Sequence, residues 1–155
     1  MHVLIIDAQG GGIGRQLVAA IRQTIPEAVI TAVGTNSVAT SAMRKAGAHD
    51  AATGENAVVV ACRKADVIVG PIGIVIADSL LGEITPVMAT AVGQSSAKRI
   101  LIPFNHCDNL IAGVSNTSVS ALLQEAVSIL RQLADVRKEA RQMSIGKCNK
   151  TKKYF

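Results

Sequence analysis

Short apolar runs alternate with amphipathic segments over most of the chain, and this alternation limits the folds that the chain can adopt. Five runs have the length and composition of buried strands, at residues 2–7, 28–33, 48–52, 66–70 and 99–103. The segment after the first run carries small or apolar residues on one helical face: Gly14, Leu17, Val18, Ile21 and Ile25. Strands that alternate with helices are joined by right-handed crossovers and lie parallel. The pattern therefore predicts an α/β fold with a Rossmann-like, doubly wound, mainly parallel five-stranded sheet.

Start and stop signals separate the predicted helices. Three further helices are expected, over residues 37–46, 55–64 and 86–95. Gly47 stands at the C′ position of one of them, and Thr85 with Pro86 provides an N-cap and a proline at the first position of another. We expect the helices on both faces of the sheet. Residues 109–114 leave open a short sixth strand.

The last quarter of the chain predicts a long helix and a basic tail. From about Ser118, one helical face carries four apolar residues: Leu122, Ala126, Leu130 and Leu133. Seven of the 16 basic residues but only one of the 11 acidic residues follow Val136, so the tail is strongly basic and the rest is nearly balanced. We expect a single Rossmann-like domain over residues 1–136, and over 137–155 a tail that is partly helical and then flexible.

Composition narrows the class of protein. Apolar residues make up 49% and charged residues 17% of the chain, a balance typical of a soluble α/β protein. The longest apolar stretch, residues 67–77, is too short for a transmembrane helix, which needs about 20 residues, and the N-terminus lacks the features of a signal peptide. Three widely spaced cysteines form neither a disulfide framework nor a zinc pattern. These features predict a cytoplasmic protein without a membrane segment or metal site.

The basic tail is the feature that favours contact with nucleic acid. Basic side chains bind phosphate backbones through counterion release. However, two Phe and one Tyr provide no platform on which bases could stack. We expect at most weak contact with nucleic acid, through the tail.

The segment IIDAQGGGIGRQL places a glycine run between the first predicted strand and its helix. A dinucleotide-binding loop needs one glycine for the turn, one for close approach to the pyrophosphate and one for helix–strand packing. The three consecutive glycines can serve the first two purposes, and Gly14 can serve the third. The spacing is not that of G-x-G-x-x-G, because Arg15 stands where the last glycine is needed. The context favours phosphate binding over a tight turn without a ligand. The predicted residues are Gly10, Gly11, Gly12, Ile13 and Gly14.

A second loop should lie beside the glycine run. In a Rossmann-like order the first and fourth strands are neighbours, so the loops after them meet at the carboxyl edge of the sheet. The loop after the fourth strand contributes the predicted wall residues Gly70, Pro71, Ile72 and Gly73. The segment 103–107, after the fifth strand, should stand alongside.

The end of the second strand bears on the kind of ligand. Cofactors with a free ribose 2′-hydroxyl usually meet an acidic residue there, but residues 34–44 contain none. Hydroxyl and amide groups are offered instead by Thr35, Asn36 and Ser37. With Arg44 and Lys45 close behind, the pattern fits an NADP-like or other phosphorylated ligand. The same residues can be explained without a ligand. Asn36 or Ser37 would then cap the following helix, and Arg44 and Lys45 would lie on its solvated face.

Few side chains near the predicted crevice suit catalysis. The only tyrosine is Tyr154 in the tail, which excludes the tyrosine-dependent chemistry of short-chain dehydrogenases. Three candidates remain: Cys107, His106 and Asp7. A nearby imidazole can lower the pKa of a thiol, although Cys107 is equally explained as a small buried residue. Asp7 could bind a cation or accept hydrogen bonds from the glycine turn.

Three other residues have local explanations. Glu55 lies in the first turn of a predicted helix, where an acid suits the helix dipole. Glu83 stands two residues before the Thr85 N-cap, and Cys62 shares an apolar helix face with Val58. None of the three requires a catalytic function.

Five motifs together resemble a small bacterial family, the domain of unknown function 3842: IDAQGGGIG, GTNSVATSAMRKAGA, ATGENA, ADVIVGPIGIVIADSLLGEITPVMA and KRILIPFNHC. The resemblance runs from about residue 2 to residue 115 and leaves out the long helix and the basic tail. Ala8 stands where glycine would be expected in that family. The resemblance implies a Rossmann-like fold and carries no activity with it.

Three functions are compatible with these sequence features. The first is binding of a nucleotide or other phosphorylated metabolite by the glycine loop, in a crevice that a homodimer would close. The second is an enzyme that uses Cys107, with His106 or Asp7, on a phosphorylated substrate. The third is a ligand-free dimeric assembly protein that pairs through residues 72–81 and the C-terminal helix.

Overall fold

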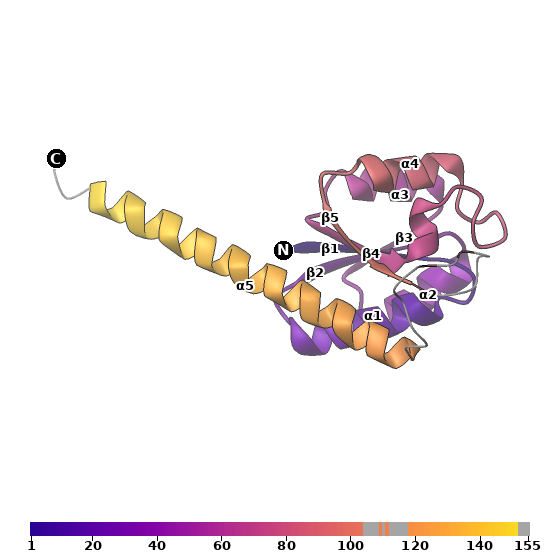
Figure 1. Cartoon of the computed structure of the whole chain (residues 1–155), viewed down its shortest axis with the longest axis horizontal. Helices are drawn as coiled ribbons and strands as arrows, with labels where there is room; N and C mark the ends of the chain where they lie inside the picture. Colours follow the sequence, from indigo (N-terminus) through magenta and orange to yellow (C-terminus); the bar gives the residue numbers. More distant parts are fainter. Residues whose placement is uncertain (104–108, 110, 112–117, 152–155) are drawn as a thin grey trace.

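A computed structural model of the chain describes residues 1–103, 109, 111 and 118–151. Its centre is a sheet of five parallel strands: β1 His2–Asp7, β2 Val29–Gly34, β3 Asp50–Thr53, β4 Val67–Pro71 and β5 Lys98–Ile102. The strand order β3-β2-β1-β4-β5 confirms the predicted Rossmann-like arrangement (Figure 1). The order reverses between β1 and β4, so a topological switch point lies at their carboxyl ends. The alternative sixth strand falls mostly outside the described residues.

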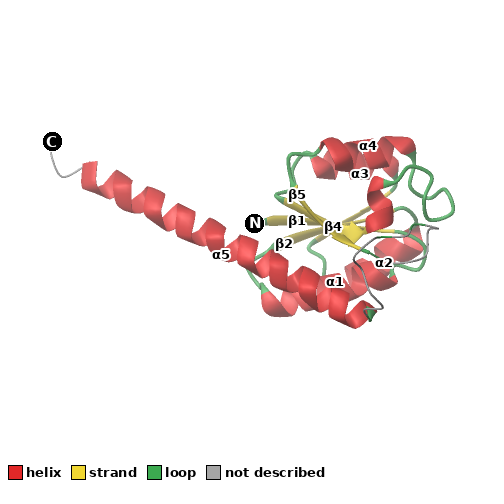
Figure 2. Cartoon of the chain, viewed as in Figure 1, coloured by secondary structure: helices red, strands yellow, loops and turns green. Residues whose placement is uncertain are grey.

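Helices cover both faces of the sheet, as predicted (Figure 2). One face carries α1 Gly12–Thr24, α2 Ser37–Lys45 and α5 Val119–Thr151, and the other carries α3 Glu55–Cys62, α4 Pro86–Gln94 and the short 3-10 helix η1 Ile72–Val75. Val3 and Ile5 of β1 join the core beneath α1 and α5, whereas Leu4 and Ile6 join the core beneath α3 and α4. Because β1 is buried on both faces, its sequence is a continuous apolar run.

The helix termini show why the helices begin and end where they do. The Asn36 side chain accepts hydrogen bonds of 2.9 Å from two backbone amides in the first turn of α2. Thr85 caps α4 through one amide at 3.2 Å, with Pro86 at the first helical position. Beyond the end of α2, Gly47 takes a φ of 107°. These observations confirm the predicted caps.

The C-terminal helix α5 packs on α1 and β5 along its first half. Its buried residues there are Leu123, Ala126, Val127, Leu130 and Ala134. Two ion pairs join the start of the expected basic tail to the body: Arg137 Nη1 lies 2.6 Å from Asp66 Oδ1, and Lys138 pairs with Glu27. The helix continues without a break at residue 136 and extends beyond the body (Figure 1). No helix in the described part of the chain is both long and apolar enough to span a membrane.

Replacing Leu130 by alanine should destabilise the protein by roughly 2–5 kcal/mol, because its fully buried side chain joins α5 to the core. Val38 of α2 is 63% exposed and serves as the control. Val38→Ala should change the free energy of unfolding by less than about 1 kcal/mol. Urea denaturation of the full chain measures both changes. Equal losses in the two variants would show that α5 is not docked through Leu130.

Candidate functional site

The carboxyl edge of the sheet brings together the segments that were predicted to form a crevice. The glycine loop follows β1 and leads into α1, Thr35 and Asn36 follow β2, and η1 follows β4. Because β1 lies between β2 and β4, the three segments meet at one edge. The geometry of this edge therefore decides what the loop can bind.

Asp7, the last residue of β1, holds the glycine loop from below. Its side chain is buried, and its two carboxylate oxygens accept hydrogen bonds from the Ala8 amide at 2.8 Å and the Gly14 amide at 2.6 Å. Burial raises the pKa of Asp7, and nearby Glu83 adds to the increase, whereas the backbone hydrogen bonds act to lower it. The geometry thus supports Asp7 as the acceptor for the glycine turn rather than as a cation ligand. Within the described residues, no group of three or more His, Cys, Asp or Glu could hold a metal ion.

Two of the glycines are required by the fold itself. Gly11 has a φ of 66°, and a Cβ on it would lie 2.7 Å from the Ala39 Cα. A Cβ on Gly14 would lie 2.5 Å from the Met43 Sδ and 2.8 Å from the Asp7 Cβ. A side chain at either position would push α1 away from α2 or from the sheet. The predicted packing function of Gly14 is confirmed.

Gly10 and Gly12 are in a different situation. Neither has a left-handed backbone, and a Cβ on either would meet no heavy atom within 4 Å. No described residue accepts a hydrogen bond from their exposed amides. The first turn of α1 carries no acidic residue, and its N-cap residue Gly11 has no side chain, but the Asp7 carboxylate binds the Gly14 amide of that turn. The amides of Gly10 and Gly12, which have no partner among the described residues, therefore lie beside a helix N-terminus at which Asp7 already binds the Gly14 amide.

Glu83 belongs to this edge, although its sequence position suggested only the start of α4. Its carboxylate reaches from the loop between η1 and α4 to the loops after β1 and β2. Oε2 accepts hydrogen bonds from the Gln9 amide and the Asn36 Nδ2, each at 2.9 Å, and from the Thr35 hydroxyl. Burial acts to raise the pKa of Glu83, but the three hydrogen bonds outweigh it, so the pKa is lowered. Glu83 is therefore negatively charged at neutral pH.

The predicted wall residues after β4 pack against the chain itself. A Cβ on Gly70 would lie 2.5 Å from a carbonyl oxygen of β1, so this glycine lets β4 approach β1. The buried Ser79 hydroxyl donates a 2.6 Å hydrogen bond to the Gly73 carbonyl oxygen. Pro71 is buried and Ile72 is half-buried. These residues support the η1–α4 loop.

The η1–α4 loop, residues 76–85, keeps its shape at a conformational cost. Asp78, Leu80 and Leu81 have φ values of 62°, 55° and 61°, in a region that non-glycine residues rarely adopt. Each such residue costs about 1 kcal/mol or more. The Asp78 amide donates a 2.8 Å hydrogen bond to the Ile84 carbonyl oxygen and closes the loop. Strain of this kind is concentrated at functional sites.

Ser37 lies apart from the other residues predicted at the end of β2. Asn36 provides the cap of α2, which confirms one of the two interpretations of that residue. Ser37 is the first residue of the helix and lines a groove between α1 and α2, together with Arg15 and Lys45. Arg44 is exposed. Arg15 and Lys45 therefore line the α1–α2 groove, while Asn36 is hydrogen-bonded within the carboxyl edge.

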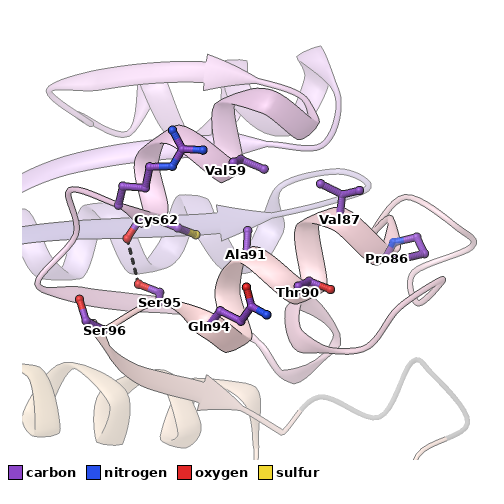
Figure 3. Close-up of a pocket in the computed structure, with 10 residues that line it drawn as sticks. Val59, Cys62, Pro86, Val87, Thr90, Ala91, Gln94, Ser95 and Ser96 are labelled. Atoms are coloured by element: carbon purple, nitrogen blue, oxygen red, sulfur yellow. Dashed lines mark hydrogen bonds between the residues drawn. The ribbon is translucent and has the colours of Figure 1, made fainter.

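A further groove lies between α3 and α4, on the opposite face of the sheet from α1 (Figure 3). Cys62 borders it, but burial raises the pKa of this thiol to about 11, so the thiol is protonated at neutral pH. The Ser95 hydroxyl donates a 2.9 Å hydrogen bond to the Cys62 carbonyl oxygen. The prediction that Cys62 and Val58 are core residues is confirmed. The residues that line this groove include no activated nucleophile.

The hypothesis of a thiol enzyme depends on residues outside the described part of the chain. His106 and Cys107 both lie there, as does Tyr154. The segment 103–107 is described at Pro103 alone. Catalysis by Cys107 therefore stays a prediction.

Comparison with known proteins identifies a family. A model described as a domain of unknown function (DUF3842) matches residues 2–135, which confirms the resemblance seen in the motifs and extends it into α5. No curated protein matches the chain. One similar solved structure is the dodecameric FMN-dependent Ubix-like decarboxylase from Escherichia coli O157:H7, with 18% identity, 83% of this chain and 75% of that chain covered, and a TM-score of 0.44. A likeness at this level carries no argument about ligand or activity.

Replacing Glu83 by glutamine should change how stability depends on pH. The pKa of Glu83 in the folded chain lies below its ordinary value of 4.5, so the ionised carboxylate stabilises the fold above that pH. The stabilisation is lost as the pH falls through the folded-state pKa. The raised pKa of Asp7 acts in the opposite direction, and it should fall in Glu83→Gln because the charge of Glu83 contributes to the increase.

Urea denaturation at a series of pH values measures the difference in unfolding free energy between the unmodified chain and Glu83→Gln. The difference should be constant from neutral pH to about pH 5 and should shrink at lower pH. A difference that does not change down to about pH 3 would contradict the hydrogen bonds assigned to Glu83.

Proposed function

The chain belongs to the DUF3842 family, a domain of unknown function, and we propose that it binds a nucleotide or another phosphorylated metabolite through the glycine loop. The observation that carries this proposal is that Gly10 and Gly12 have no structural reason to be glycine among the described residues. Neither backbone conformation nor packing requires glycine at these positions, and their amides have no partner among the described residues. A phosphate that approaches backbone amides closely does require the absence of side chains.

The surroundings of the loop favour an anion in part. The N-terminus of α1 carries partial positive charge, and no acidic residue stands in its first turn. Arg15 follows in the first turn with an exposed side chain. Asp7 lies behind the loop with both its oxygens hydrogen-bonded to amides, and its carboxylate opposes an anion there. A phosphate on the amides of Gly10 and Gly12 would therefore meet favourable charge from the helix terminus and Arg15, and repulsion from Asp7 and Glu83.

We propose binding of a ligand and no reaction. The cysteine pattern favours the reducing cytoplasm as the place where this binding occurs. A sensor or regulatory module needs no acid–base pair. Of the three catalytic candidates, only Asp7 lies among the described residues, and its two oxygens are already bonded to amides. The described part of the edge thus supports a ligand site more directly than a reaction.

Thermal denaturation against nucleotides, nicotinamide and flavin cofactors and phosphorylated metabolites tests this proposal. A ligand present at about 100 times its Kd adds about 2.7 kcal/mol, which raises the Tm of a domain of this size by a few degrees. Gly12→Val should abolish that shift, because its side chain would occupy the place of the phosphate. The unliganded variant should stay folded, because a Cβ there meets open space.

Gly11→Ala is the matched control for this variant. It should lower the stability of the unliganded chain by about 2 kcal/mol, because of its left-handed backbone and its contact with Ala39. A panel without any shift, or a shift that survives Gly12→Val, would count against the glycine loop as a phosphate site.

A second candidate function, assembly as a homodimer, is favoured by one surface of α5. Ile129, Val136 and Met143 are 40%, 64% and 66% exposed. Because they stand seven residues apart, they form one apolar stripe along the helix, as in a coiled coil. A second copy of this chain would cover the stripe by pairing helix to helix.

Sedimentation equilibrium of the full chain should detect this dimer. The double variant Val136→Ser and Met143→Ser should weaken it, because the substitutions remove two of the three apolar side chains of the stripe. Val38→Ser is the control, since Val38 is 63% exposed on α2 and lies outside the stripe. A full chain that is monomeric at the highest concentration tested would exclude this assembly.

A further inference from the structure

Glu83 is an unusual neighbour for a loop that binds phosphate. The ion pairs Arg137–Asp66 and Lys138–Glu27 do not involve it. Its Oε2 is held by three donors, and no described residue donates a hydrogen bond to its Oε1. A carboxylate with one oxygen anchored and the other open accepts hydrogen bonds from hydroxyl groups and repels phosphate. The carboxylate beside the loop therefore suits a hydroxyl group, whereas the amides of the loop suit a phosphate.

The position of this carboxylate matches a requirement of nucleotide sites. In Rossmann-type sites an acidic residue at the end of the second strand accepts hydrogen bonds from the ribose hydroxyls. This chain has no acidic residue from 34 to 44. Glu83 nevertheless lies against Thr35 and Asn36, the two residues that follow β2. The carboxylate comes from the η1–α4 loop instead of from the end of β2.

The hydroxyl acceptor and the proposed phosphate site are adjacent. Glu83 Oε2 accepts a hydrogen bond from the Gln9 amide, and Gly10 is the next residue along the chain. In a nucleotide the ribose and its 5′-phosphate are neighbours in the same way. The edge therefore places a hydroxyl acceptor, Glu83, beside the proposed phosphate site, just as a nucleotide carries its ribose hydroxyls beside its 5′-phosphate.

We infer that Glu83 accepts a hydrogen bond from the ligand's ribose, and that the ligand is a nucleotide with unsubstituted ribose hydroxyls. This inference rests on the proposed phosphate-binding function and replaces the NADP-like expectation. A 2′-phosphate would bring a second negative charge against the Glu83 carboxylate, which is fixed in place by its three donors. Asp78, Leu80 and Leu81, whose backbones are left-handed, lie in the same loop as Glu83.

Calorimetric titration of the full chain with four probes tests the inference: AMP, 2′-deoxy-AMP, adenosine 2′,5′-bisphosphate and inorganic pyrophosphate. AMP should bind about tenfold more tightly than either the deoxy or the 2′-phosphorylated probe, as expected for one hydrogen bond to a charged group. Glu83→Gln should remove most of this discrimination. It should also tighten binding of the bisphosphate more than binding of pyrophosphate, because the lost repulsion acts at the 2′ position.

Glu55→Gln is the matched control. Glu55 also accepts a hydrogen bond from a threonine hydroxyl, that of Thr85 at 2.6 Å, but it has no hydrogen bond to the glycine loop. Its substitution should leave all the affinity ratios unchanged. Equal tightening of bisphosphate and pyrophosphate in Glu83→Gln would overturn the inference, because the carboxylate would then occupy the phosphate position itself.

The inference and the proposed function fail in different ways. If Gly12→Val abolishes AMP binding and Glu83→Gln leaves the ratios unchanged, the ribose contact is overturned and the phosphate site stands. Binding of pyrophosphate without binding of AMP would likewise overturn the ribose contact and leave the phosphate site. If neither AMP nor pyrophosphate binds to the unmodified chain, the ribose contact and the phosphate site are both overturned.

Discussion

The hydrogen bond from the Gly14 amide to Asp7 joins the central strand to the first helix, and the geometry of the carboxyl edge depends on it. A buried carboxylate must be matched by donors, and Asp7 is matched by the amides of Ala8 and Gly14. The missing side chain of Gly14 leaves the room for this contact. Because strand and helix are clamped at this point, the amides of the intervening loop are held at the edge of the sheet rather than over its face.

Glycines within one short loop meet different demands, which is why their number alone says little about function. Gly11 and Gly14 allow close packing, whereas Gly10 and Gly12 border open space. Charge around the loop is divided in a similar way, because the helix terminus attracts anions and Glu83 repels them. A site with attractive and repulsive parts side by side selects ligands by where their charge lies, and not only by how much they carry.

Much of this architecture was accessible from the sequence because it is encoded locally. The strands follow from short apolar runs, and Asn36 and Thr85 could be recognised as caps because the partners of a cap lie within one turn. Glu83 could not be placed, because its partner Gln9 lies 74 residues away and their contact depends on strand order and on a strained loop. Its position two residues before the Thr85 N-cap already explained an acidic residue there, so no distant contact was expected. The long C-terminal helix was predicted, but not its continuation to Thr151, because among the residues whose burial is described the last buried one is Ala134.

The position of α5 has a consequence for the order in which the chain acquires structure during synthesis. Among the residues that the structure describes, the core beneath α3 and α4 draws on none beyond Leu101. The core on the other face needs Leu130 and Ala134, which leave the ribosome late. Until then Leu17 and Ile21 of α1 lack part of their cover, although the rest of the sheet can already form. The speed of translation through the last part of the chain therefore sets how long an apolar face is open to aggregation or to a chaperone.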